Sequence, residues 1–198
     1  MKILFLILLI YPIQLFSQEN KPEIKRNFIA IFPKKNKKIT ANGIGIGPIL
    51  AASPKSKING LALEIPGIGI IGQFGKGPVD SISINYIKVN GISISALGTF
   101  SNTNGISING FGSSGYQNNG LFFSLGFAFF AKGNGIIISG FNHCKDLKGL
   151  QIGFLNSTQK ARGLQIGVTN YSNDLKGIQI GIWNVNNKRK LPLINWNF

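Results

Sequence analysis

Cysteine and histidine are nearly absent from this 198-residue sequence, which contains only Cys144 and His143. A single cysteine excludes an intramolecular disulfide, so other interactions must hold the fold together. Adjacent residues of a strand point to opposite faces, which argues against a Cys–His catalytic pair. One histidine and one cysteine also leave a metal site without its remaining ligands. We therefore expect a structural or incidental role for both residues.

Acidic residues are also scarce, with 6 Asp and Glu against 21 Lys and Arg, and the net charge is +15. The carboxylates are too scattered to nominate a hydrolytic pair. Residues 67–72, GIGIIG, match the dinucleotide-binding pattern, but the sequence after them, which includes Pro78, cannot form the helix that such a loop requires. We expect no enzymatic activity, no catalytic, cofactor-binding or metal-binding residues, and no cofactor.

Helical periodicity is missing after residue 18, and so are the marks of disorder. Charged residues make up 14% of the chain, which also contains 15 Phe, whereas disordered chains are rich in charge and poor in aromatics. The 26 glycines follow no three-residue period, which excludes collagen. These features predict a folded, glycine-rich, all-β protein.

The N-terminus predicts export. Lys2 precedes an apolar run over residues 3–10 that is too short to cross a bilayer as a helix, and we expect residues 1–17 to be a signal peptide. Residues 18–42 form a basic lead-in segment with four lysines between Lys34 and Lys38, which we interpret as a solvated loop. Export disfavours nucleic acid as a partner, so the basic charge favours membrane lipids or an anionic envelope surface.

A repeat organises residues 43–198, the predicted β repeat domain. The phrases GLQIGFLN, GLQIGVTN and GIQIGIWN begin at Gly149, Gly163 and Gly177, 14 residues apart. The clearest repeats span residues 91–184, and a closing strand is expected over residues 191–198. Glycines open the predicted strands at Gly43, Gly60, Gly91, Gly105, Gly120, Gly135, Gly149, Gly163 and Gly177.

Two architectures accommodate such a repeat: an up-and-down outer-membrane-type β-barrel of about 10–12 strands, or a β-solenoid with 14-residue coils. The ten-residue alternation from Leu121 to Phe130 suits a membrane-spanning strand, and the alternating Ile194, Trp196 and Phe198 suit the last strand of a barrel. In a solenoid, Lys148, Arg162 and Lys176 would stack about 4.8 Å apart and repel one another. The barrel is favoured on these grounds, with the solenoid as the alternative.

Alternation also divides each repeat into two faces. Leu150, Ile152 and Phe154 form an apolar stripe that we expect to meet lipid or core, and Gln151 lies on the opposite face, where substitution should be tolerated. Against the barrel, the repeated glutamines and asparagines would make good hydrogen-bonded ladders in a solenoid. These residues are Gln151, Gln165, Gln179, Asn156, Asn170 and Asn184.

The repeat units resemble a bacterial surface-repeat family whose members carry G-[LIV]-Q-[IL]-G-x-x-N about every fourteen residues behind a signal peptide. The likeness is specific over residues 145–198, loose over 91–144 and absent before Gly43. It implies an outer-membrane or cell-surface location and brings no established activity. We expect an exported envelope protein with a structural or interaction role, the alternatives being a β-solenoid binding module or a narrow outer-membrane pore.

Overall fold

The computed structural model describes residues 23–26, 28–33, 37–53, 55–67 and 87–198. The predicted signal peptide over residues 1–17 lies outside these ranges, as do most of the GIGIIG match and residues 34–36 of the lysine run. The elements are β1 (Ile24–Arg26), β2 (Ile29–Ile31), β3 (Ile39–Gly47), the 3-10 turn η2 (Leu50–Ala52), β4 (Lys57–Glu64), β5 (Ile87–Ser95), β6 (Gly98–Asn109), β7 (Gly112–Ser124), β8 (Phe127–Ile138), β9 (Phe141–Asn186) and β10 (Lys190–Asn197).

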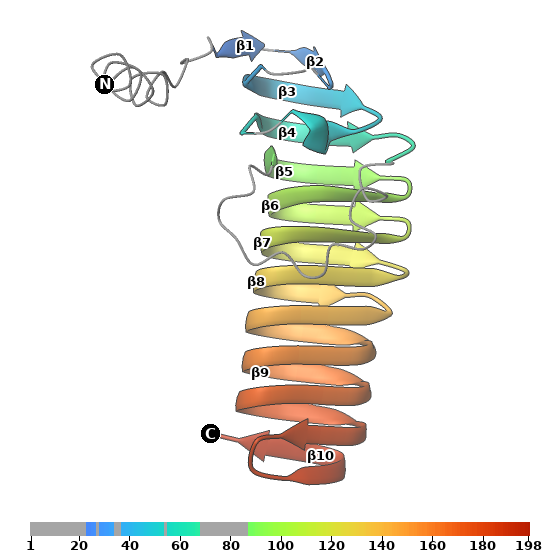
Figure 1. Ribbon diagram of the computed structural model, residues 1–198, viewed down its shortest axis with the longest axis vertical. Coiled ribbons are helices and arrows are strands. Elements are labelled where there is room, and N and C mark those ends of the chain that lie inside the picture. The colour runs from blue at the N-terminus through green and yellow to red at the C-terminus, as the bar shows by residue number, and fades with distance from the viewer. Residues whose placement is uncertain (1–22, 27, 34–36, 54, 68–86) are drawn as a thin grey trace, which may run out of the picture.

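The strands stack as a β-solenoid, and the predicted barrel is therefore wrong (Figure 1). Every pairing from β3 to β9 is parallel, whereas an up-and-down barrel needs antiparallel neighbours. Equivalent residues of successive repeats are direct partners, as with Gly91 and Gly105 or Gly135 and Gly149. The alternative prediction, an all-β solenoid of glycine-rich coils, is confirmed.

A column of glycines forms one corner of the solenoid, which we call the glycine corner. All nine predicted coil-opening glycines have positive φ, for example +131° at Gly149 and +140° at Gly163. A Cβ at Gly163 would also collide with the carbonyl oxygen of Gly149, and the same holds from coil to coil along the column. Glycine is therefore required at this corner by both backbone conformation and close approach.

Departures from the 14-residue spacing are absorbed outside the glycine corner. The longer spacing between Gly105 and Gly120 coincides with a register shift between β6 and β7 after Phe100. There the side chain of Asn102 accepts hydrogen bonds from the backbone N–H groups of Tyr116 and Gln117, at 3.0 and 2.9 Å. Because the bulged backbone keeps its partners, the coils on both sides stay in register.

The solenoid interior changes character along its axis. The first coils enclose an apolar cluster that includes Phe32, Ile58 and Ile87, and the middle coils enclose a second cluster around Phe122 and Phe130. The rings of Phe122 and Phe130 meet edge to face, with their centroids 5.1 Å apart. Each cluster is a hydrophobic core, and the coils between the two clusters bury hydroxyl and amide side chains such as Ser93, Ser107 and Asn118.

The last coils bury two amide ladders in addition to Leu147, Ala161 and Leu175 of the second apolar cluster. In the first, Gln165 donates to Gln151 at 2.9 Å and Gln179 donates to Gln165 at 2.8 Å. The second joins Asn142, Asn156, Asn170 and Asn184 in steps of 2.7–2.8 Å. Each of the first three asparagines also donates to a backbone carbonyl at 2.9 Å. The predicted ladders are confirmed, and they pair the buried amides with one another and with the backbone, except at Nε2 of Gln151, which is buried without a partner.

Both ends of the stack are covered. At the N-terminal end β1 and β2 pair in parallel with β3. At the C-terminal end β10 pairs antiparallel with the last turn of β9, and Asn195 continues the glutamine ladder by donating to Gln179 at 3.0 Å. These strands occupy edges that would otherwise present unpaired backbone groups.

The prediction of which side chains matter for packing is wrong in one respect. Gln151 is fully buried, whereas Ile152 is half-buried and Phe154, also in β9, is 57% exposed. The proposed ten-residue strand from Leu121 is also wrong, because β7 ends at Ser124 and a turn follows before β8. The aliphatic side chains face outward, and the amides occupy the core.

We expect Gly163→Ala to lower the free energy of unfolding by at least about 2 kcal/mol, because alanine disfavours positive φ and its Cβ meets the Gly149 carbonyl. Urea unfolding followed by circular dichroism measures this. Gln159→Ala, at an exposed site, is the control and should change stability little. Equal stability of the two variants would contradict the packing of the glycine corner.

We expect Gln165→Met to be more destabilising than Ile166→Thr, although the second change removes more hydrophobic surface. The methionine fills a similar volume but leaves Gln151 without its donor and Gln179 without a ladder acceptor, at about 1–3 kcal/mol for each orphaned group. Ile166 is only half-buried on the outside of the sheet. The same unfolding assay decides, and a larger loss for Ile166→Thr would invert the assignment of inside and outside.

Candidate functional site

Cys144 and His143, the candidate Cys–His pair, lie on opposite sides of their strand, as expected from strand geometry. Cys144 is fully buried, and its thiol donates to the carbonyl oxygen of Asp146 at 3.2 Å. Burial raises the pKa of Cys144 to about 12, which disfavours the thiolate that nucleophilic chemistry needs. His143 is half-exposed, and its ring lies 6.4 Å from that of Phe129.

The structure buries the carboxyl group of Glu64, which the sequence analysis did not single out. Glu64 ends β4 and has no exposed surface. Burial raises the pKa of its carboxyl group to about 7, although its Oε1 accepts a hydrogen bond from the backbone N–H of Leu50 at 3.2 Å. Glu64 lies in the solenoid wall beside η2, so we assign it to the packing of the first coils.

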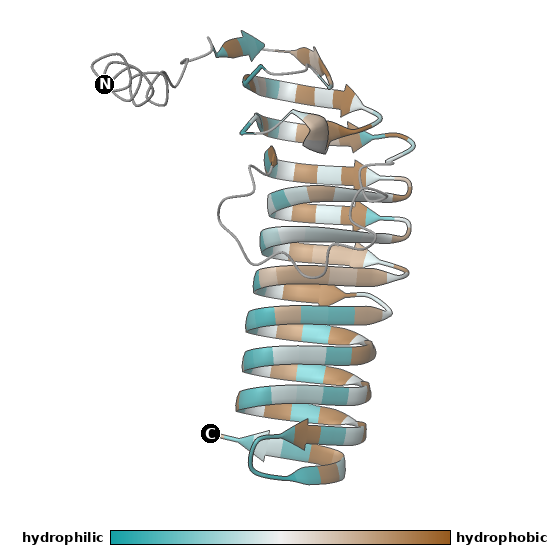
Figure 2. Ribbon diagram, in the orientation of Figure 1, coloured by the Kyte–Doolittle hydropathy of each residue, from teal (hydrophilic) through white to brown (hydrophobic). Residues whose placement is uncertain are grey.

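The candidate site is a sheet face on the outside of the solenoid, which we call the apolar face. It consists of the outward side chains that lie one and three residues after each corner glycine. The face comprises Ile44, Ile46, Leu61, Leu63, Ile92, Ile94, Ile106, Ile108, Leu121, Phe123, Ile136, Ile138, Leu150, Ile152, Leu164, Ile166, Ile178 and Ile180. Every member is aliphatic or Phe, and many are 36–43% exposed. Figure 2 shows hydrophobic segments recurring coil above coil.

The apolar face continues at both ends and around one turn. Ile29 and Ile31 of β2 extend it at one end, and Ile194 and Trp196 of β10 extend it at the other. The turn that follows the face, which we call the turn edge, carries exposed apolar side chains at Leu97, Phe111, Leu125, Phe141, Phe154, Ile182 and Trp183. A shallow groove of about 780 Å³ runs between face and turn edge in the last coils.

Cations gather on the other side of the glycine corner. Lys148, Arg162 and Lys176, which we call the basic corner, each precede a corner glycine. Lys148 and Arg162 help line a groove of about 420 Å³ that also contains Lys132, Lys160 and one carboxylate, Asp146. The solenoid therefore has an apolar side and a neighbouring side that is polar and basic.

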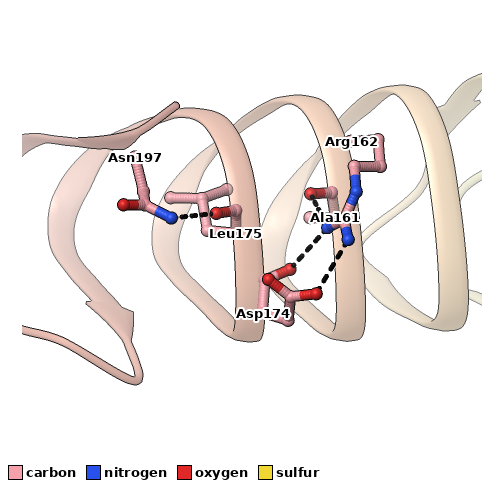
Figure 3. Close-up of polar contacts among 5 residues, drawn as sticks. All are labelled: Ala161, Arg162, Asp174, Leu175 and Asn197. Atoms are coloured by element: carbon pink, nitrogen blue, oxygen red, sulfur yellow. Dashed lines mark hydrogen bonds and ion pairs between the residues drawn. The ribbon is translucent and has the colours of Figure 1, made fainter.

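The stacking of the basic corner, which counted against a solenoid, is relieved by a carboxylate. The guanidinium of Arg162 forms an ion pair with Asp174 in the following coil, with 2.8 Å between Nη2 and Oδ2 (Figure 3). The hydrogen bond from Arg162, together with nearby cations, lowers the pKa of Asp174 below its usual range. The predicted repulsion is therefore too weak to prevent parallel stacking.

Other kinds of site find no support in the described part of the chain. Nowhere in it do three or more His, Cys, Asp or Glu side chains gather as metal ligands. No helix among the described residues is both long and apolar enough to cross a membrane. Comparisons with protein-family models, with curated proteins and with solved structures gave no match.

Glu64 predicts a pH dependence of stability. Its pKa in the fold, about 7, lies above the ordinary value of 4.5, so its contribution is fully present below pH 4.5 and is lost as the pH rises to about 7. The loss should be on the order of 3 kcal/mol. Urea midpoints measured from pH 4.5 to 8 should fall for the native chain and fall less for Glu64→Gln. If the urea midpoints of the native chain and of Glu64→Gln fall equally with pH, the carboxyl group of Glu64 is not buried as described.

Proposed function

We propose that this protein is a non-catalytic β-solenoid binding module of the cell envelope and that the apolar face is its binding surface. The observation that carries the proposal is the exposure of this face in the part of the chain that the structure describes. Its rows of aliphatic side chains run the length of a solenoid whose interior is already filled. Soluble monomers rarely expose contiguous apolar patches larger than a few hundred Å², and larger ones mark interaction sites.

The position of the face supports a binding role over a packing role. Gln151, Gln165 and Gln179 point inward from the same strands and have no exposed surface, so the outward aliphatics contribute little to the core. The buried side chains also argue against the pore alternative, because the interior of these coils is occupied by hydrogen-bonded amides. The solenoid can therefore present its outer faces without rearranging its inside.

The cell-envelope location in this proposal is supported by the sequence. The apolar run over residues 3–10 behind Lys2 is typical of an exported chain. The G-[LIV]-Q-[IL]-G-x-x-N units resemble those of bacterial surface proteins, which supports an outer-membrane or cell-surface location. The net charge of +15 suits an anionic envelope surface as the partner.

Fractionation of native cells tests the proposal. We expect the native chain to sediment with the envelope and to lack residues 1–17 by mass spectrometry. A face variant carrying Ile106→Thr, Ile136→Thr and Ile180→Thr should move largely to the soluble exported fraction, because threonine retains strand propensity but loses apolar surface.

A matched control carries Gln159→Thr, Asn173→Thr and Asn187→Thr, all at exposed positions outside the apolar face, and should fractionate like the native chain. Circular dichroism verifies that both variants fold. A folded face variant that stays with the envelope would show that the apolar face is not the binding surface. An intact Met1 in the cytoplasm would contradict export.

A further inference from the structure

We propose that the occupant of the apolar face is the surface of an anionic lipid bilayer, on which the solenoid lies lengthwise with its basic corner against lipid phosphates. This inference rests on the proposed function, because it names the partner of the same surface. It is carried by the backbone pairing of the face, by the uniformity of its side chains and by the different chemistry of its two borders.

The backbone of the face is compatible with an apolar medium. In a solenoid the strand hydrogen bonds run along the axis, so each rung of the face is paired with the coils above and below. The end strands β2 and β10 pair with the first and last rungs. Few backbone groups of the face would thus lose hydrogen bonds to water on contact with lipid, which is the main requirement for structure in hydrocarbon.

The side chains match the depth of a bilayer interface. The face carries two aliphatic columns over nine coils, a length on the order of 40 Å at the spacing of parallel strands. Only the outward side chains would enter the boundary between headgroups and acyl chains, and the solenoid body would stay in water. This is how interfacial amphipathic elements bind, through a buried apolar surface and a charged flank.

The two borders of the face differ as a lipid interface requires. On one side of the last three coils a single glycine separates a basic residue from an aliphatic one, as in Lys148-Gly149-Leu150 and Arg162-Gly163-Leu164, whereas an asparagine precedes the glycine in the first six coils. On the other side the turn edge presents exposed aromatic rings at Phe141, Phe154 and Trp183. Basic side chains attract anionic headgroups, and aromatic side chains such as Trp are enriched where membranes meet water.

Charge favours a bilayer over a second copy of the chain. A face-to-face pair of solenoids would bring together two bodies that each carry a net charge of +14, which is the +15 of the full sequence without Lys2 of the signal peptide. Anionic headgroups would instead neutralise the basic corner and the lysines of the adjacent groove, Lys132 and Lys160. The same apolar area therefore meets a complementary charge in one case and a like charge in the other.

Vesicle co-sedimentation with the full chain purified from native envelopes tests the inference. We expect binding to vesicles of phosphatidylcholine and phosphatidylglycerol, and at least about tenfold weaker binding to phosphatidylcholine alone. The face variant should lose binding to both. A charge variant with Lys148→Gln, Lys160→Gln and Lys176→Gln should lose most of the preference for phosphatidylglycerol.

The control for the charge variant removes the same number of cations at the N-terminal end of the solenoid, through Lys25→Gln, Arg26→Gln and Lys37→Gln. It should keep more of the preference for phosphatidylglycerol than the charge variant does. Equal losses in the two variants would overturn the role of the basic corner, because net charge alone would then explain the preference. Binding that ignores phosphatidylglycerol altogether would overturn the anionic bilayer.

Two further outcomes separate this inference from the proposed function. If the face variant leaves the envelope fraction but the native chain binds no vesicle, the face is a binding surface and the bilayer is not its occupant. Sedimentation velocity without lipid tests whether a second copy of the chain occupies the apolar face. A dimer of the native chain that the face variant dissociates would assign the face to a second copy and overturn the lipid proposal.

Discussion

The steric constraint at the glycine corner underlies the rest of the structure. At each coil start the backbone adopts a positive φ and passes so close to the preceding coil that a Cβ would strike a carbonyl oxygen. A column of glycines satisfies both conditions and fixes the coils directly above one another. This alignment brings equivalent residues within hydrogen-bonding distance, which permits the glutamine and asparagine ladders. It also gathers the outward aliphatics into straight columns.

As a consequence, amide side chains are buried and many aliphatic side chains face outward, unlike in most globular domains. In the last coils the interior contains amide ladders, most of whose polar groups are paired along the axis with the coils on either side. Leu147 and Leu175 are buried beside the ladders, and the leucines and isoleucines of the apolar face point outward. An outward aliphatic column repeated in every coil is costly in water, so its presence points to a partner that covers it. In this respect the packing of the core and the proposed binding surface are two results of the same repeat.

The two sides of the solenoid can then serve different chemistry. The apolar face and turn edge provide hydrophobic area, and the basic corner provides charge at their border. The ion pair between Arg162 and Asp174 shows how the corner tolerates stacked cations, because a carboxylate in the next coil partly neutralises them. An anionic envelope surface, and specifically a lipid bilayer, is the partner that we propose for this combination. A rigid solenoid would offer it a surface that is ordered before binding, which reduces the entropic cost of association.

The sequence by itself determined the all-β class, the repeat, the nine corner glycines and the ladder residues inside the repeat units, because these depend on local alternation and spacing. It did not indicate Asn142 or Asn195, which extend the two ladders from outside those units. It also placed Cys144 and His143 on opposite sides of their strand. Parallel or antiparallel pairing was decided only by the tertiary structure, since a strand and turn of fourteen residues can either reverse direction or complete a coil. The same holds for Gln151 and Ile152, because alternation separates two faces without saying which is inside. That choice depends on whether equivalent glutamines stack, and stacking is a property of neighbouring coils that no single repeat contains.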